Sequence, residues 1–330
     1  MRIVRLTYLC RKSFERAAIV IKNFWIRRKH YSWKYATYDL LEWIGFYSRS
    51  SRLQLIGIKK KQLWLDGYIE QNYGSIIERF RNLRESGTIA KDFNIWVFWA
   101  QGEENMPPIV KACYRQLCAN NKGVVKLLDL KNVGQYVSLP GFVFEKLREG
   151  KLLYAHFSDI LRHSLIAKYG GFWIDATCWT GGAFPEELRQ GAFISPHNEE
   201  DGTYWCSYAL GSGLTGSVTF SFVKAMLIAV CEKEEVWPDY LFQDRLLDYA
   251  HRKVGASREA INATPANNTR RFLLYPMLNK PFDEAFYNDL TSTDWLFKLS
   301  YKSNFNTEQN GKETFYGKMI KGTINVRHKG

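Results

Sequence analysis

One stretch of the sequence combines a helix, two glycines and a short apolar strand, and it constrains how the surrounding chain folds. In residues 158–169 apolar side chains recur at intervals of three and four, the spacing of a helix with one buried face. Gly170 and Gly171 follow, and glycine commonly ends a helix. The apolar run 172–174 then predicts a buried strand, with Asp175 directly after it. Because ligands of open α/β sheets bind at the carboxyl ends of the strands, we expect Asp175 to lie in a binding site.

Two charged residues lie close together on the predicted helix. Asp159 and Arg162 are three residues apart, so they share one face near its N-terminal end. In that position they can present a carboxylate and a guanidinium to one ligand. An acidic residue at a helix start is also common as a cap or in a surface ion pair, and an aspartate after a strand is common in turns. Each feature alone therefore fits a structural role as well as a binding role.

The combined pattern is more specific than its parts. The chain from Phe157 to Thr177 has the form FSDxLRxxLxxKYGGxWIDAT, which resembles the capsular polysaccharide synthesis proteins, grouped with the family 32 sugar transferases. It is also similar, at the same spacing, to the catalytic core of the glucosylating bacterial toxins. The resemblance extends over roughly residues 93–322. It implies an α/β fold, with a GT-A-like nucleotide-sugar-binding domain around a mainly parallel central sheet, preceded by an N-terminal helical segment.

The resemblance also assigns roles to residues of this stretch. It implies that the donor is bound by Asp159, Arg162, Gly170 and Gly171. In the relatives, an Asp-x-Asp motif binds a divalent cation on the pyrophosphate of the donor, and the first aspartate of that motif matches Asp175. The second is replaced here by Thr177. The resemblance therefore implies Mn²⁺ or Mg²⁺ as cofactor, bound by Asp175 and Thr177, with Asp175 also taking part in catalysis.

The chain before this stretch alternates between predicted strands and helices. Residues 95–99 and 124–129 predict buried strands, and residues 109–120 and 143–148 predict helices. This alternation is typical of an α/β domain with a mainly parallel sheet. By the resemblance, Trp99 stacks on the uracil of a uridine diphosphate donor, although a tryptophan in a strand is also common in a core.

The segment 237–244 resembles the second acidic element of the family. Pro238 at a helix start would place Asp239 in the first helical turn. The resemblance implies that Asp244 is catalytic, contacting the acceptor hydroxyl or the positive charge that develops on the sugar. A solvated carboxylate on a helix is the alternative for Asp244.

The C-terminal part resembles a loop that closes over the donor in relatives. Ser300 and Tyr301 are the matching donor-binding candidates. Lys298 and Lys302 are expected to balance phosphate charge. These assignments come from the resemblance alone.

The charge of the chain is concentrated at its N-terminus. Residues 1–61 carry 15 Lys and Arg and three acidic residues, a net charge of +12 out of +13 for the whole chain. A helical projection of residues 2–25 places apolar side chains on one side and basic ones mostly on the other. Such a helix is typical of proteins that lie on an anionic membrane surface, where each basic residue contributes about 1 kcal/mol. The alternatives are a basic helix that packs on its own domain and one that binds nucleic acid.

The sequence predicts three parts. Residues 1–61 form a basic amphipathic helical segment that contacts an anionic membrane surface through residues 1–30, residues 62–92 form a helical adaptor, and residues 93–330 form the GT-A-like domain. No run approaches the roughly 20 apolar residues needed to span a bilayer. The six cysteines lack the paired spacing of a zinc site and suggest no disulfide framework, which fits a reducing cytoplasm. We therefore expect a cytoplasmic protein, peripheral on the inner face of the cell membrane.

These observations together predict a metal-dependent glycosyltransferase. It would move a sugar from a nucleoside diphosphate donor, by resemblance a UDP-sugar, to a lipid-linked oligosaccharide in capsule or surface polysaccharide synthesis, with retention of configuration. One alternative is a sugar-phosphate transferase, which releases a nucleoside monophosphate. Another is an inactive transferase fold that binds membrane or nucleic acid. A nucleic-acid partner is not expected, because residues 62–330 are nearly neutral. The sugar, the acceptor, the linkage and the oligomeric state do not follow from the sequence.

Overall fold

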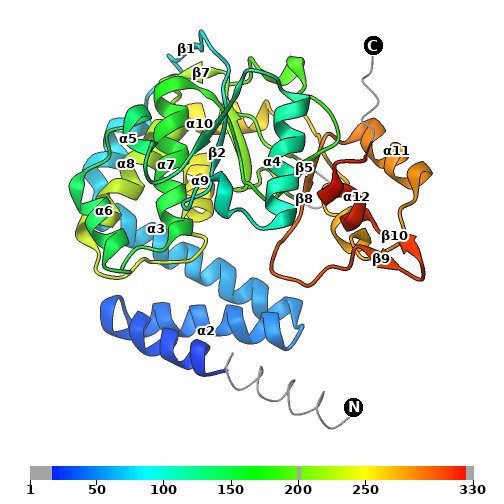
Figure 1. The fold of residues 1–330 in the computed structure, drawn as a ribbon. Coiled ribbons are helices and arrows are strands. Elements are labelled where there is room, and N and C mark those ends of the chain that lie inside the picture. The colour runs from blue at the N-terminus through cyan, green and yellow to red at the C-terminus, as the bar shows by residue number, and fades with distance from the viewer. Residues whose placement is uncertain (1–16, 199–201, 325–330) are drawn as a thin grey trace.

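A mainly parallel sheet forms the centre of the molecule. The computed structural model describes residues 17–198 and 202–324 (Figure 1). The sheet has the strand order β3-β2-β4-β6, formed by β2 (Ile95–Phe98), β3 (Val125–Leu128), β4 (Gly171–Ile174) and β6 (Ala209–Ser212). Strand β2 is parallel to β3 and β4, whereas β6 is antiparallel to β4. The predicted α/β class with a mainly parallel sheet is confirmed.

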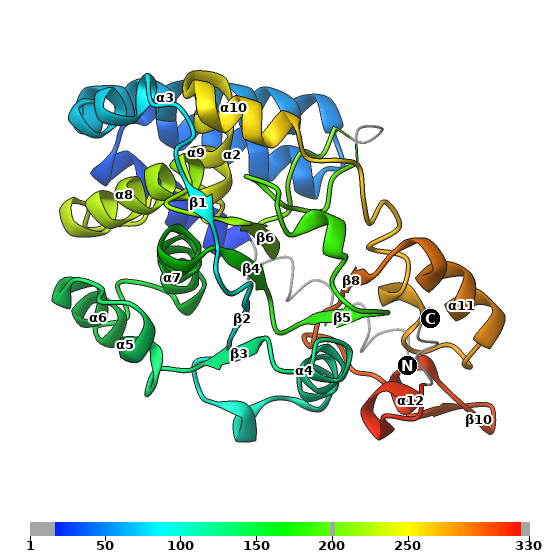
Figure 2. The same cartoon turned by 90° about the horizontal axis from the view of Figure 1, so that it is seen from above.

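The sheet separates two hydrophobic cores, because successive side chains of a strand point to opposite faces. Trp96 and Trp173 belong to one core, and Ile95 and Val97 to the other. The helices that contribute to the first core include α5 (Val133–Tyr136), α6 (Gly141–Arg148), α7 (Tyr154–Tyr169), α8 (Val218–Lys233), α9 (Phe242–Lys253) and α10 (Gly255–Asn262). Figure 2 shows these helices on one side of the sheet and α4 (Pro108–Asn120) on the other.

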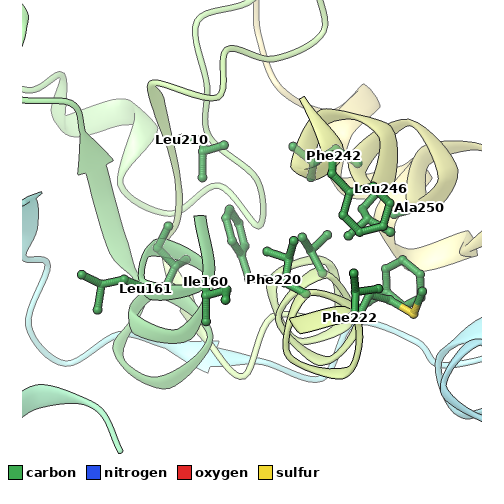
Figure 3. Packing of buried hydrophobic residues seen from close by; sticks show 14 of the residues in the cluster. Ile160, Leu161, Leu210, Phe220, Phe222, Phe242, Leu246 and Ala250 are labelled. Carbon is green, nitrogen blue, oxygen red and sulfur yellow. The ribbon is translucent and has the colours of Figure 1, made fainter. Parts of the chain in front are cut away.

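Large apolar side chains fill the space between three of these helices. Ile160 of α7, Phe220 of α8 and Leu246 of α9 are all fully buried and lie close together (Figure 3). Helix α7 begins at Tyr154, four residues earlier than predicted, and its first turn adds the fully buried Phe157 to the apolar face. The helix predicted at 143–148 likewise begins at Gly141.

The two glycines after α7 are required by the close approach of β4 to β2. Gly170 and Gly171 have φ angles of 68° and 89°, which other residues rarely adopt. A Cβ atom on Gly171 would lie 2.2 Å from the carbonyl oxygen of Asn94, the residue directly before β2. The glycines therefore allow the chain to leave α7 and to enter the sheet as β4, directly beside β2.

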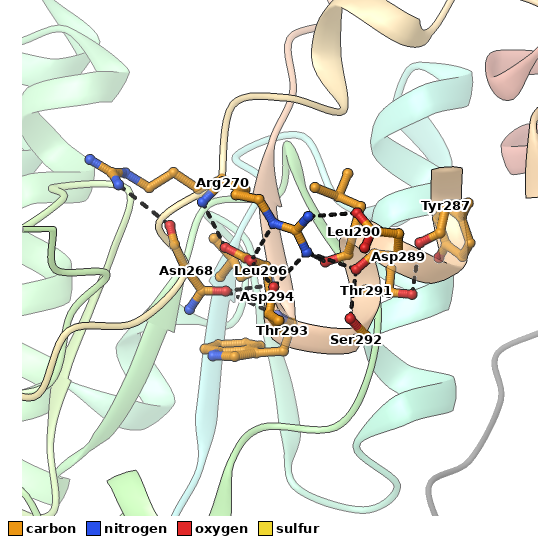
Figure 4. Close-up of polar contacts among 12 residues, drawn as sticks. Asn268, Arg270, Tyr287, Asp289, Leu290, Thr291, Ser292, Thr293, Asp294 and Leu296 are labelled. Carbon is orange, nitrogen blue, oxygen red and sulfur yellow. Dashed lines mark hydrogen bonds and ion pairs between the residues drawn. The ribbon is translucent and has the colours of Figure 1, made fainter. Parts of the chain in front are cut away.

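The C-terminal part adds a second small sheet to the edge of the domain. Strand β5 (Cys178–Thr180) pairs antiparallel with β8 (Leu296–Lys298). The side-chain oxygen of Asn268 accepts hydrogen bonds from the backbone N–H groups of Trp295 and Leu296, and Arg270 contacts Asp294 just before β8 (Figure 4). The other elements are β1 (Thr88–Ile89), β7 (Leu214–Thr215), β9 (Glu308–Gln309), β10 (Lys312–Glu313), α11 (Glu284–Thr293), α12 (Phe315–Lys321) and the short helices η1 (Glu103–Asn105), η2 (Glu186–Leu188) and η3 (Tyr275–Met277).

The N-terminal part is helical and packs on the domain. Residues 17–30 are helical, and α2 (Trp33–Tyr47) and α3 (Ser51–Arg81) form a close pair beneath the sheet in Figure 1. The predicted amphipathic segment 2–25 lies largely outside the described residues. The predicted division between residues 61 and 62 falls inside α3, whose backbone departs from helical geometry only at Tyr73. Within the described part of the chain, no helix combines the length and the apolar character needed to cross a membrane.

A buried cluster of charges joins this helical pair to the domain. The ammonium of Lys61 lies 2.9 Å from Asp39 and 3.0 Å from Asp239, and it also contacts Glu42. Arg245 of α9 contacts Asp239 at 3.0 Å and Glu42 at 3.2 Å. Burial lowers the pKa of Lys61, but the three carboxylates together raise it above its ordinary value. Helix α9 begins at Phe242, three residues after Asp239, so the prediction that Asp239 lies in the first helical turn is wrong, and its carboxylate binds Lys61 instead.

Replacing Lys61 by methionine is expected to lower the free energy of unfolding by about 3–5 kcal/mol, since removing one partner leaves buried carboxylates uncompensated. Urea unfolding followed by circular dichroism measures this change. Lys60→Met is the matched control, because Lys60 is exposed one residue away and is expected to change the free energy by less than about 0.5 kcal/mol. Equal free energies of unfolding for the two variants would show that the charge cluster contributes nothing to stability.

Candidate active site

A cleft of about 560 Å³ opens at the carboxyl ends of β2 and β4. It is lined by side chains from the loop after β2, from α7, from the start of α9 and from the segment after β8. The cleft brings together eight of the predicted site residues: Trp99, Asp159, Arg162, Asp175, Thr177, Asp244, Ser300 and Tyr301. Gly170 and Gly171 do not line it, because they lie at the opposite end of β4 from Asp175 and serve the packing of that strand.

The carboxylate of Asp175 is held by three side chains of the cleft. Its carboxylate accepts hydrogen bonds from the indole N–H of Trp173 at 3.0 Å and from the ammonium of Lys298 at 2.8 Å, and Arg162 lies 3.4 Å away. Burial raises the pKa of Asp175, but Lys298 and Arg162 lower it more, so the net pKa is below its ordinary value. The group therefore remains a carboxylate at neutral pH.

Asp159 and Arg162 lie close together on α7, as their spacing predicted, and form an ion pair. The guanidinium lies 3.5 Å from the carboxylate, donates a hydrogen bond to the backbone carbonyl of Ser207 and stacks over Trp173. Burial is the main reason that the pKa of Asp159 rises to about 7, against the opposing effect of Arg162. Gln243 joins the pair: with its amide assigned to satisfy its neighbours, its nitrogen donates to Asp159 at 3.2 Å and its oxygen accepts from Arg162 at 2.9 Å.

Asp244 lies in the first turn of α9 and faces the cleft. It is half-buried and accepts a hydrogen bond from the indole N–H of Trp205 at 3.2 Å. Burial raises its pKa to about 6, although Arg162 and Trp205 oppose this shift. The position is therefore not that of a freely solvated helical carboxylate.

Two aromatic side chains form the rim of the cleft. The rings of Trp99 and Tyr301 meet edge to face, with their centroids 5.6 Å apart. The indole N–H of Trp99 donates to the backbone carbonyl of Asn105 at 3.3 Å. The neighbouring Ser300 accepts a hydrogen bond from the backbone N–H of Lys302. The rim thus offers flat apolar faces next to the charged floor of the cleft.

The residues predicted to bind a metal already contact an ammonium group. Lys298 donates to Asp175 and also to the hydroxyl of Thr177, at 2.9 Å. Mg²⁺ and Mn²⁺ prefer several oxygen ligands, whereas the predicted site supplies one carboxylate and one hydroxyl. Among residues 17–198 and 202–324, no group of three His, Cys, Asp or Glu side chains is placed to hold a metal. These residues do not fit a divalent cation unless Lys298 moves away, and the dependence on Mn²⁺ or Mg²⁺ stays a prediction.

Several cleft residues were not predicted from the sequence. Gln243 stands next to Asp244, in the segment singled out as the second acidic element, but an amide in a helical pattern has no distinctive spacing. Tyr208 and Tyr240 line the cleft from loops far apart in the chain. Their approach depends on long-range packing that local patterns do not report.

Comparison with known proteins gives three kinds of similarity. The chain is 34% identical over 100 residues to the O-glycosyltransferase braB of Annulohypoxylon truncatum, covering 27% of this chain and 23% of that protein. It is 29% identical over 92 residues to the O-glycosyltransferase PaGT of Phomopsis amygdali, covering 25% of this chain and 23% of that protein. The chain therefore spans about a quarter of the length of these curated relatives.

A solved structure described as PaToxG Glycosyltransferase is similar over 81% of this chain and 99% of its own, at 14% identity and a TM-score of 0.38. The sequence profile of the capsular polysaccharide synthesis proteins matches residues 47–319. That match spans most of the 330 residues and agrees with the resemblance found at residues 157–177. The chain belongs to the capsular polysaccharide synthesis protein family.

Proposed function

We propose that the protein is a glycosyltransferase that moves a sugar from a nucleoside diphosphate to a hydroxyl group of a saccharide acceptor. The observation that carries the proposal is the cleft at the carboxyl edge of the sheet, where the Asp159–Arg162 pair lies beside Asp175 and Lys298. Membership of the family and the names of the two O-glycosyltransferases that the chain resembles support the same class of reaction.

The cleft has a separate feature for each part of a nucleotide sugar. Asp159, Arg162 and Gln243 offer a carboxylate, a guanidinium and an amide, which suit the hydroxyls of a sugar. Trp99 and Tyr301 offer aromatic faces and edges for a base, and the family resemblance supports uracil. Cationic groups near the diphosphate stabilise the charge that develops as it leaves.

The transfer forms a bond between the acceptor oxygen and the anomeric carbon and breaks the bond from that carbon to the diphosphate. The diphosphate leaves with the bonding electrons, and the proton of the acceptor passes to it or to solvent. Asp244 lines the same cleft and is suited to stabilise positive charge on the sugar or to bind the acceptor hydroxyl. By the family resemblance, the reaction proceeds with retention, through attack from the face that the diphosphate leaves.

A second hollow beside the cleft is suited to the acceptor. This acceptor groove, of about 540 Å³, lies between α3 and α9 and shares Leu241 and Asp244 with the cleft. Its apolar lining includes Ile58, Leu63 and Trp205. A lipid-linked saccharide has both an apolar part and a sugar hydroxyl, so we propose that such an acceptor lies in this groove with its hydroxyl toward Asp244.

The proposal is tested by incubating purified protein with a panel of nucleotide sugars, with and without Mn²⁺, and measuring the released nucleotide by chromatography. Release of nucleoside diphosphate from one donor is the expected result. Release of monophosphate would instead establish the sugar-phosphate transferase reaction. If no nucleotide is released and calorimetry detects no binding of any donor, the protein would instead be an inactive transferase fold that binds other molecules.

The pH dependence of kcat/KM is expected to show an acidic limb with a midpoint between about 6 and 7. Asp244, with a pKa of about 6, and Asp159, with a pKa of about 7, act as carboxylates, so activity is lost as pH falls through these values. Asp244→Asn is expected to lower kcat/KM. Its pH profile is expected to keep only the acidic limb that reflects the ionisation of Asp159. A profile that stays flat from pH 5 to 8 would show that neither group needs to be ionised.

The N-terminal helix is proposed to bring the protein to the inner face of the cell membrane. Arg28 stacks on Trp25 and Trp33, and these rings are exposed together with Ile19 and Ile21. Basic groups beside exposed apolar side chains suit an anionic lipid surface. This region also packs on its own domain, because Arg27 of the helix, Tyr31 directly after it and Tyr35 of α2 donate hydrogen bonds to backbone carbonyls of residues 236–238.

Binding to vesicles of anionic phospholipid is expected to weaken as salt is raised, because the basic groups contribute through screened charge. The double variant Lys22→Glu and Arg28→Glu is expected to bind at least about tenfold more weakly in a vesicle sedimentation assay. The matched control is Lys131→Glu with Lys312→Glu, two exposed lysines outside the N-terminal segment. If both double variants lost vesicle binding equally, the net charge alone would attract the protein to the vesicles. That result would contradict a specific membrane-binding face.

A further inference from the structure

We propose that Lys298 supplies the positive charge that neutralises the leaving diphosphate, in the position that a divalent cation would otherwise occupy, so that sugar transfer proceeds without a metal. This inference rests on the proposed glycosyltransferase function. It concerns one cation of the cleft, and it differs from the metal dependence that the family resemblance implies.

The first argument is the position of the ammonium group. Lys298 lies 2.8 Å from a carboxylate oxygen of Asp175 and 2.9 Å from the hydroxyl oxygen of Thr177. These are the two groups that the sequence pattern assigns to a metal. A single cation already bridges both of them.

The second argument is that Lys298 is reachable by a ligand. Its side chain lines the cleft and is 24% exposed. The bonds to Asp175 and Thr177 account for two of the three N–H donors of an ammonium group. The third donor is suited to an oxygen of the diphosphate, beside the guanidinium of Arg162 that contacts Asp175 from another direction.

The third argument is that the backbone holds this lysine in place. Lys298 is the register partner of Cys178 in the antiparallel pair of β5 and β8. Its backbone N–H donates to the carbonyl of Arg271, and the N–H of Leu299 donates to the carbonyl of Thr177, at 2.9 Å and 3.0 Å. The hydrogen bonds from the start of β8 to Asn268 fix the other end of the strand (Figure 4). The position next to Thr177 is therefore set by strand pairing rather than by a flexible surface loop.

The fourth argument is the cost of adding a metal at this point. A divalent cation bound to Asp175 and Thr177 would have to displace the ammonium or lie within a few ångströms of it. Two such charges about 4 Å apart repel by several kcal/mol at the effective dielectric constant of a protein surface. Thr177 contributes no negative charge to offset this repulsion, whereas an aspartate at that position would.

In the reaction, the N–H group of Lys298 donates to a diphosphate oxygen as the bond from the anomeric carbon to the diphosphate breaks. The bonding electrons leave with the diphosphate, the acceptor oxygen forms the new bond to the anomeric carbon, and the proton of the acceptor hydroxyl passes to the departing diphosphate or to solvent. No electron acceptor or additional reactant is needed. The role of Lys298 is electrostatic, and the lysine remains protonated throughout.

The test is donor turnover and nucleoside diphosphate binding by metal-stripped protein, in EDTA and then with added Mg²⁺ or Mn²⁺. We expect turnover in EDTA within about threefold of that with metal, and calorimetric binding of a nucleoside diphosphate such as UDP in EDTA. Lys298→Met is expected to reduce kcat by about 100-fold or more, the typical effect of removing one group that stabilises transition-state charge. Added metal is not expected to restore the kcat of Lys298→Met. The Lys298→Arg variant, which keeps the positive charge, is expected to retain part of the original kcat.

Lys312→Met is the matched control, because Lys312 is exposed on β10 and outside the cleft, and it is expected to keep full activity. Thermal unfolding of each variant separates loss of function from loss of fold. Turnover or nucleotide binding that appears only with metal would overturn the inference and leave the glycosyltransferase proposal standing. No turnover and no binding, with or without metal, would overturn both.

Discussion

Replacing Asp175 by asparagine is expected to reduce kcat/KM for sugar transfer by about 100- to 1,000-fold. The substitution keeps the shape of the side chain but removes the charge that holds Lys298 and contacts Arg162. Both cations would then shift from the positions in which they face the donor, and groups of this kind typically contribute a few kcal/mol to catalysis. Steady-state kinetics with the donor found to be active measures the loss.

The matched control for this variant is Asp289→Asn. Asp289 also pairs with an arginine, Arg270, but it lies on α11 outside the cleft (Figure 4). Its replacement is expected to leave kcat/KM within about twofold of the original value, since surface ion pairs contribute little. If Asp175→Asn retained full activity while folding normally, Asp175 would not be a catalytic residue.

Replacing Gly171 by alanine is expected to destabilise the fold by about 3 kcal/mol or more and to reduce the yield of folded protein. The added Cβ atom would lie 2.2 Å from the carbonyl oxygen of Asn94 and 3.0 Å from the indole nitrogen of Trp96. The backbone at Gly171 also has a φ angle of 89°, which disfavours any side chain. Since β2 and β4 are the central strands, the clash cannot be relieved at an edge of the sheet. Urea unfolding measures the change.

Gly67→Ala provides the comparison. Gly67 lies on the exposed side of α3, and a Cβ atom there would meet no side chain and no other segment of the chain within 4 Å, apart from its immediate chain neighbours. Alanine is expected to stabilise this helix by about 0.5–1 kcal/mol, because glycine is a poor helix former. The opposite signs of the two substitutions would show that the effect at Gly171 comes from its position. A stable Gly171→Ala protein would mean that β4 can move away from β2.

The stretch from Phe157 to Thr177 made the centre of the fold predictable. A helix, a glycine pair and an apolar strand that follow one another in the chain are placed by local geometry, so the positions of Asp159, Arg162 and Asp175 could be inferred together. Their convergence in one cleft follows from the parallel sheet, whose strands end at the same edge.

Residues distant in the chain were less predictable from local patterns. Lys298 and Asp244 were found only because the family resemblance pointed to their segments. Gln243 was missed because its role depends on the exact register of α9 against α7. The position of Asp239 in a helical turn was predicted wrongly, and its ion pair with Lys61 was missed because Lys61 is 178 positions earlier in the chain and no local pattern links the two.

The glycines show a different limit of sequence reasoning. Gly170 and Gly171 were correctly predicted to end a helix, but the resemblance also assigned them to the donor. The structure gives them a packing role outside the cleft. A motif can therefore include residues that maintain the fold alongside residues that contact the substrate.

The charge cluster around Lys61 has a consequence for efforts to isolate the protein. A truncation that removes the basic N-terminal part and keeps only the sheet-containing part would delete Lys61 and Glu42. Asp239 and Arg245 would then lose these partners while remaining largely buried. Those two residues frame the first turn of α9, where Asp244 faces the cleft. A truncated protein of this kind is therefore expected to be less stable than one that keeps α2 and α3.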